Sequence, residues 1–112
     1  MTAGAMICFV IYLLVALIMI GIGFVQIKSS TPVGFYSGEK PPRPEELTDV
    51  ILWNKKHGAM WVLYGFLILL SYFSGAVILD SVWCIIPLCG VPIIAILFMI
   101  RYHNKLKRDF MR

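Results

Sequence analysis

Three long apolar runs, separated by one polar segment and one very short turn, dominate the sequence. The runs cover residues 5–27, 59–79 and 82–100, and none of them contains Asp, Glu, Lys, Arg or His. As a helix rising about 1.5 Å per residue, the 23 residues of the first run reach ~34 Å, whereas the hydrocarbon core of a bilayer is about 30 Å thick. The pattern therefore predicts an all-α membrane protein with three transmembrane helices, formed as a single integral-membrane domain.

The polar segment, residues 28–58, divides into a proline-rich part and a charged part. Glycines flank a pair of aromatic residues, Phe35 and Tyr36, and predict a turn that presents both rings at the membrane interface. Over residues 45–57, acidic side chains stand near the start and basic ones near the end, as the helix dipole favours. We predict a short amphipathic helix there, lying on the membrane surface or against the other helices, with Gly58 letting the chain turn into the bilayer.

The second and third runs carry signals for helix packing and for irregular backbone. Ser71 and Gly75 are four residues apart, so they share one helix face and permit close approach of a neighbouring helix. The turn at Asp80 is short enough to force the two runs into antiparallel contact, and Asp80 could cap the following helix. Pro87 and Pro92 predict a kink in the third run, which we interpret as a packing feature.

The basic residues determine the predicted orientation. Of the ten Lys and Arg residues, five lie in the segment 28–58 and five in a basic tail, residues 101–112. With three spans these two regions share one side, which the positive-inside rule makes the cytoplasm, so the N-terminus is predicted outside the cell membrane. The net charge of +4 is then a topology signal that favours anionic lipid headgroups, and it does not indicate a nucleic-acid partner.

Composition narrows the function classes further. Apolar residues make up 60% and charged residues 14% of the chain, and the mean hydropathy is +0.85, which excludes a soluble domain of this size. Spans without ionisable groups argue against a proton-coupled transporter acting alone. No catalytic motif occurs, so we expect no enzymatic activity. His57 and His103 should both lie at the inner membrane surface, where a shared site is sterically possible, but two histidines are few for a metal or haem, and we expect no cofactor.

The sharpest local signal is Trp53 followed four residues later by His57, with Asn54 beside them, just before the second run. The order of first span, Gly/Thr/Pro loop, acidic helix start, W-x-x-x-H and second span resembles the integral-membrane immunity proteins against the sporulation-delaying toxin. It also resembles small bacterial membrane proteins related to them, over residues 22–73. The resemblance implies a role in immunity or envelope signalling, with Trp53 and His57 in a cytoplasmic motif.

Two functional hypotheses follow. The first is a non-enzymatic multi-pass membrane protein that acts by binding a partner, through Trp53, Asn54 and His57 and through the aromatic pair Phe35 and Tyr36. Three spans bury little surface, so the partner could be a second copy or a larger membrane protein. The alternative is an accessory subunit of a membrane transporter or enzyme complex. A structural role, in which Trp53 and His57 merely anchor an interfacial helix, stays open beside both.

Overall fold

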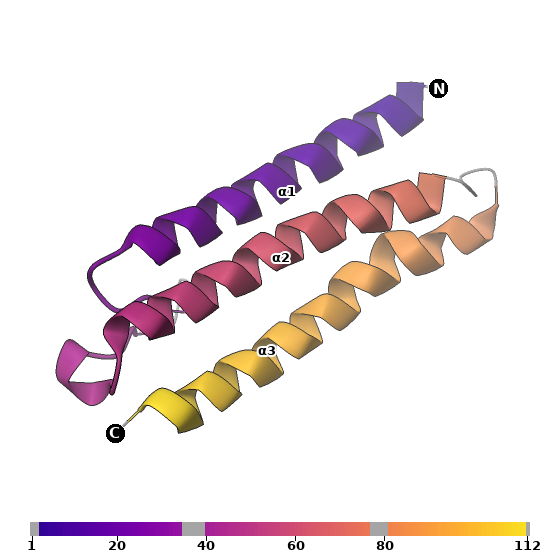
Figure 1. The fold of residues 1–112 in the computed structure, drawn as a ribbon. Helices are drawn as coiled ribbons and strands as arrows, with labels where there is room; N and C mark the ends of the chain where they lie inside the picture. The colour runs from indigo at the N-terminus through magenta and orange to yellow at the C-terminus, as the bar shows by residue number, and fades with distance from the viewer. Residues whose placement is uncertain (1–2, 35–39, 77–80, 112) are drawn as a thin grey trace.

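A computed structural model describes residues 3–34, 40–76 and 81–111, and these form three long helices. Figure 1 shows α2 lying between α1 and α3. The three helices, the last counted from Val82, are long and apolar enough to cross a membrane. The prediction of an all-helical chain with three candidate spans is therefore confirmed. The bounds are α1 Ala3–Lys28, α2 Val50–Ala76 and α3 Val91–Phe110, with short helical turns at Pro44–Glu46, Val82–Cys84 and Ile86–Gly90.

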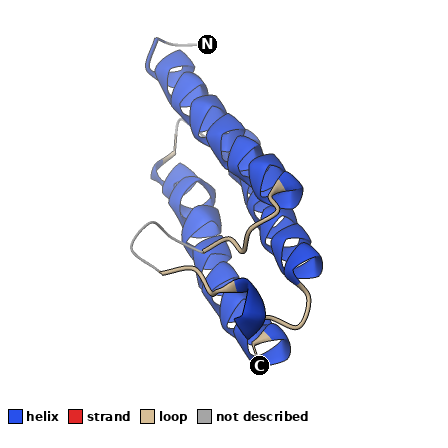
Figure 2. Cartoon of the chain, turned by 90° about the vertical axis from the view of Figure 1, so that its left-hand side faces the viewer, coloured by secondary structure: helices blue, strands red, loops and turns tan. Residues whose placement is uncertain are grey.

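The helices form an elongated bundle with two different ends. Its extents are 53 × 22 × 21 Å, so it is longer than a bilayer with its headgroups, which measures about 40–45 Å. At one end lie the connection between α1 and α2 and the C-terminus, and at the other lie the N-terminus and the start of the third helical segment (Figures 1 and 2). We call the first of these the loop end; it comprises residues 28–34, 40–58 and 101–111.

The start of α2 corrects one prediction. Residues 45–57 do not form a separate surface helix, because Pro44–Glu46 is a single 3₁₀ turn and α2 then runs unbroken from Val50 through Gly58. Asp49 caps α2, since its carboxylate oxygen accepts a hydrogen bond of 2.9 Å from the backbone N–H of Leu52. The predicted amphipathic segment is thus mostly the first two turns of the second candidate span.

Gly58 is a packing contact and does not act as a hinge. An added Cβ on Gly23 of α1 would lie 2.5 Å from the carbonyl oxygen of Gly58. One on Gly65 would lie 2.8 Å from the carbonyl oxygen of Ala16. The two contacts are seven residues apart on each antiparallel helix, so small residues at both levels let the α1 and α2 backbones approach closely. Because α2 continues through Gly58, Gly58 and Gly65 lie on the same face of α2 and both contact α1.

The third helical segment begins irregularly, with a 3₁₀ turn and a π-helix ahead of α3. Pro92 has no N–H, so the carbonyl of Leu88 lacks its usual α-helical donor. The hydroxyl of Tyr12 on α1 donates to that carbonyl oxygen over 2.6 Å. Ser81, next to the predicted cap Asp80, accepts the N–H of Trp83 over 3.2 Å, whereas Asp80 itself lies outside the described residues. Irregular backbone is placed here where side chains from neighbouring helices replace its lost bonds.

Ser71 and Gly75 both lie where α2 meets the π-helix. The Ser71 hydroxyl, fully buried, donates to the carbonyl oxygen of Pro87. An added Cβ on Gly75 would lie 2.5 Å from Cγ of Leu88. The small pair therefore allows the π-helix to pack directly on α2, and the serine also pairs with one of its carbonyls.

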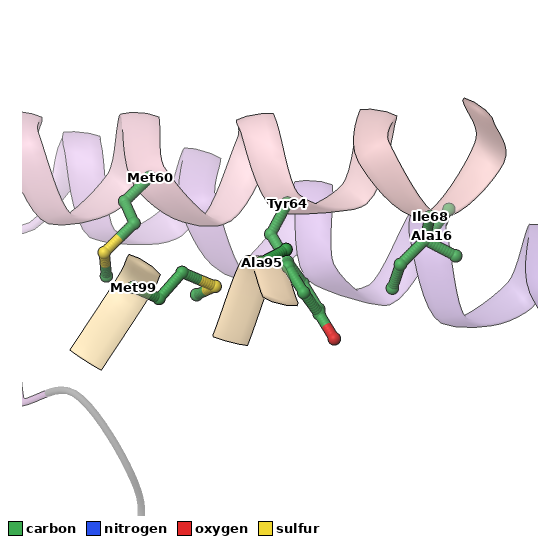
Figure 3. Close-up of a cluster of buried hydrophobic side chains, with 6 residues drawn as sticks. All are labelled: Ala16, Met60, Tyr64, Ile68, Ala95 and Met99. Carbon is green, nitrogen blue, oxygen red and sulfur yellow. The ribbon is translucent and has the colours of Figure 1, made fainter. Parts of the chain in front are cut away.

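The apolar core is thin and centred on α2 (Figure 3). Met60, Tyr64 and Ile68 follow one another at four-residue spacing and so occupy one face of α2. Ala16 of α1 and Ala95 and Met99 of α3 complete the cluster. Large apolar side chains elsewhere on all three helices are exposed, which is the surface expected of helices surrounded by lipid.

Candidate functional site at the loop end

Four polar or aromatic side chains are buried together at the loop end. Trp53, Asn54 and His57 of α2 are 0% exposed and His103 of α3 is 3% exposed. Burying such groups costs free energy unless each finds hydrogen-bond partners. We call these four residues the loop-end cluster. Its partners show what the cluster holds in place.

Asn54 ties the chain that follows α1 to the start of α2. Its Oδ1 accepts the backbone N–H of Val33 over 3.1 Å, and its Nδ2 donates to the carbonyl oxygens of Ser29, over 3.1 Å, and Thr31, over 2.9 Å. One side chain therefore satisfies three backbone groups of a segment that has no regular secondary structure of its own. Residues 29–33 are held against α2 by this amide.

Trp53 fastens the same segment from the other side. Its indole N–H donates to the carbonyl oxygen of Val33 over 2.9 Å. The ring packs edge-on against Phe110 near the end of α3, with centroids 6.3 Å apart, in an apolar cluster with Leu47 and Leu106. The indole thus joins the loop, α2 and α3 at one point.

His57 and His103 are hydrogen-bonded to each other across α2 and α3. Nε2 of His57 lies 2.8 Å from Nδ1 of His103, and Nδ1 of His57 lies 2.9 Å from the carbonyl oxygen of Trp53. A carbonyl can only accept, so Nδ1 of His57 carries a proton; in the neutral ring Nε2 is then the acceptor, and Nδ1 of His103 is the donor. The contacts assign both tautomers of the uncharged pair.

This geometry limits the chemistry of the pair. If both rings were protonated, two N–H groups would face each other over 2.8 Å, so the pair takes up at most one extra proton in this arrangement. In the described ranges, no three His, Cys, Asp or Glu side chains come together as a metal ion would require. His57 and His103 therefore do lie together, and the contact between them is a direct hydrogen bond.

The C-terminal residues close the loop end. The backbone N–H of Thr48 donates to the carbonyl oxygen of Phe110 over 2.8 Å, and Leu47 pairs with Met111 in an isolated antiparallel bridge. The predicted basic tail accordingly continues α3 as far as Phe110. Its apolar residues cover the loop-end cluster.

A small charged cleft opens beside these contacts. It has a volume of about 200 Å³ and is lined by two cations, Lys40 and Lys107, and by the Arg43–Glu46 ion pair, with Pro41, Pro42 and Met111. Arg43 donates to the Glu46 carboxylate over 2.8 Å, and this hydrogen bond holds the pKa of Glu46 below its usual range. Because the ion pair is exposed, water screens it and it adds little stability. We call this feature the basic cleft.

The structure brings three of the predicted site residues together and buries them. Trp53, Asn54 and His57 offer no exposed surface, so none of them can touch a partner in this conformation. Phe35 and Tyr36 lie outside the described residues. At about 100° per residue, the sequence predicts that Ile51 lies on the apolar face of segment 45–57 and that Trp53 and His57 lie at the margin of that face. In the structure Trp53 and His57 are fully buried, while Ile51 is 68% exposed.

Sequence reasoning missed the contribution of α3 to the cluster. Met99, His103, Leu106 and Phe110 recur at spacings of four, three and four residues, and all are buried. That is the period of a helix face, and it runs from the third apolar run into the basic tail. The sequence contains this periodic pattern, but the basic residues between its members make the segment look like a solvated tail.

Comparisons with models of protein families, with curated proteins and with solved structures found no match for this chain. The resemblance to immunity proteins therefore stays an expectation drawn from the Trp53-to-His57 pattern.

Proposed function

We propose that this is a non-enzymatic multi-pass membrane protein that acts by binding a partner, as immunity and envelope-signalling proteins do. Its three helices cross the cell membrane with the N-terminus outside and the loop end in the cytoplasm. The equal division of ten basic residues between residues 28–58 and residues 101–112 supports this orientation, since the described parts of both segments lie at the loop end.

The observation that carries the proposal is the internal hydrogen bonding of the loop-end cluster. Each side chain of the cluster is hydrogen-bonded within the bundle, and the cluster holds residues 29–33 in one position. A segment already ordered before binding loses less conformational entropy when a partner arrives. The cluster thus acts from inside, by giving the cytoplasmic surface a fixed shape.

The basic cleft is the surface we assign to partner contact. It lies on the outside of the ordered region, and it joins the proline-rich connection to the last turns of α3. Lys40 and Lys107 give it a positive character, which suits an acidic segment of a toxin, a sensor or another membrane protein. The partner is therefore expected to present carboxylates at the cytoplasmic face.

The test deletes the gene and measures sensitivity to a panel of membrane-active peptides. Lys40→Glu reverses a charge in the basic cleft, and Lys55→Glu reverses an exposed charge on α2 outside it. We expect the wild type and Lys55→Glu to restore resistance, and Lys40→Glu to insert equally well but fail to restore it. Unchanged sensitivity of the deletion strain to every peptide would reject the immunity role.

A second candidate is an accessory subunit of a larger transporter or enzyme complex, and the surface of α1 favours it. Only 6% of the apolar window of α1 is buried, although its length is ample for a span. A helix so little covered by its own chain is available to pack on another membrane protein. Purification in mild detergent should then yield a larger membrane protein at a fixed ratio, whereas a chain that purifies alone argues against this candidate.

A further inference from the structure

An apolar groove runs between α2 and α3 on the outside of the bundle. Its volume is about 480 Å³. Met60 and Tyr64 of α2 and Ala95 and Met99 of α3, four of the core residues in Figure 3, form its floor. At the end nearer the loop end it is bordered by Lys56, so the groove is apolar along its length and cationic at one mouth.

The dimensions of the groove select among possible occupants. Along α2 its lining extends from Lys56 to Leu67, which is about 16 Å at 1.5 Å per residue. This is close to half of a hydrocarbon core of about 30 Å, the depth of one leaflet. Its volume of about 480 Å³ lies within the range of small-molecule sites, about 300–1,000 Å³, and its lining is apolar, which suits one extended acyl chain.

The charge at the mouth completes the selection. Lys56 is half-buried, and its ammonium marks the level at which the apolar groove meets the loop end. Long Lys side chains at helix ends extend toward the headgroup region, where they attract anionic lipids. We propose that the groove binds one acyl chain of an anionic phospholipid, with the lipid phosphate paired to Lys56.

This lipid site rests on part of the proposed function, namely that the loop end lies at a membrane surface. It does not depend on the partner that the basic cleft recognises. Phospholipid retention and peptide resistance are separate measurements, so either proposal can fail without the other. The bound lipid would fill the space beside Met60 and Met99 and so support a core that is thin at this level.

The test is native mass spectrometry of the full chain in mild detergent. The protein is offered equal amounts of phosphatidylglycerol and phosphatidylcholine with identical acyl chains. We expect one phosphatidylglycerol retained per chain in preference to phosphatidylcholine. Glycerol phosphate, which has the same anionic group without acyl chains, should not displace it at equal concentration.

Matched variants separate the groove from the general surface. Lys56→Gln should weaken phosphatidylglycerol retention about fivefold, the effect of one cation near the surface, while Lys55→Gln, an exposed neighbour outside the groove, should not. Leu63→Trp should fill the groove and abolish retention of both lipids; Leu70→Trp, on an equally exposed leucine beyond it, should not. Size-exclusion profiles and helicity check that each variant folds.

Three results would overturn the lipid site. The first is equal retention of the two lipids by the wild type. The second is an equal loss with Lys55→Gln and Lys56→Gln, which indicates general surface attraction. The third is full retention by a folded Leu63→Trp variant, which places the lipid elsewhere.

Discussion

Replacement of Asn54 by leucine tests the central element of the loop-end cluster, because it keeps the number and branching of the side-chain heavy atoms and removes three hydrogen bonds. Each such bond contributes about 1 kcal/mol net, so the three together contribute about 3 kcal/mol. The carbonyls of Ser29 and Thr31 belong to half-buried and exposed residues and can bind water instead. The N–H of Val33 is the group that loses most. We therefore expect a loss of about 2 kcal/mol.

The assay is amide hydrogen exchange on the detergent-solubilised chain. A loss of about 2 kcal/mol in local stability corresponds to roughly 30-fold faster exchange at Val33, since about 1.4 kcal/mol is a factor of ten. Exchange in the middle of α2 should stay slow, because Asn54 supports the loop and not the helix core. Asn104→Leu, an exposed asparagine on α3, is the control and should change neither region.

A second substitution at the same position identifies which bonds matter. Asn54→Asp keeps the acceptor for the Val33 N–H but replaces the donor with a carboxylate facing the carbonyl oxygens of Ser29 and Thr31. The protection of the Val33 amide, taken relative to its intrinsic exchange rate at each pH, should be lower at pH 7 than at pH 4. The reason is that the protonated carboxyl can donate one bond to those carbonyls and carries no charge. If Asn54→Leu exchanges at Val33 no faster than Asn104→Leu, the amide does not hold the loop and the reasoning is refuted.

Three further predictions concern contacts between helices. His57→Phe and His103→Phe should each lower the free energy of unfolding by about 1–3 kcal/mol, because each leaves the partner ring buried without this hydrogen bond. The double variant should lose less than the sum of the two single losses, and additive losses in a reversible unfolding series would contradict the hydrogen bond. Gly58→Leu should separate α1 from α2 and promote aggregation, whereas Gly21→Leu, where an added Cβ meets nothing within 4 Å, should purify like the wild type; equal behaviour would argue against the close crossing. Tyr12→Phe should cost about 1 kcal/mol, because it removes the shorter of two hydroxyl bonds to the Leu88 carbonyl oxygen and leaves only that of Ser71, over 3.4 Å; an unchanged midpoint of unfolding would mean that the Ser71 hydroxyl satisfies this carbonyl alone.

Local sequence was enough for several features of the fold. Uncharged runs that match the thickness of a bilayer predicted three helices and the all-helical class, and the structure confirms both. The small residues Ser71 and Gly75 do lie at a close contact. Pro92 removes a backbone donor wherever it stands in a helix, so irregular backbone before it could be anticipated from one residue.

The interior of the candidate site could not be predicted in the same way. The end of a surface helix at Gly58 is a reasonable inference in water, where glycine weakens helices by about 1 kcal/mol. In the bundle, glycine is favoured at that position because the α1 backbone passes against it. Which face of the helix around Trp53 is buried likewise depends on the position of α3, and not on the composition of the segment.

Hydrophobicity by itself therefore determined which segments are helices and which lengths can cross a membrane, since transfer from water to an apolar phase is decided residue by residue. The tertiary structure decided the partners. The hydrogen bond between His57 and His103 joins residues 46 positions apart, and it exists because the antiparallel register of α2 and α3 sets the two rings at one level. That register results from packing along the whole length of the helices, a property that no short stretch of sequence contains.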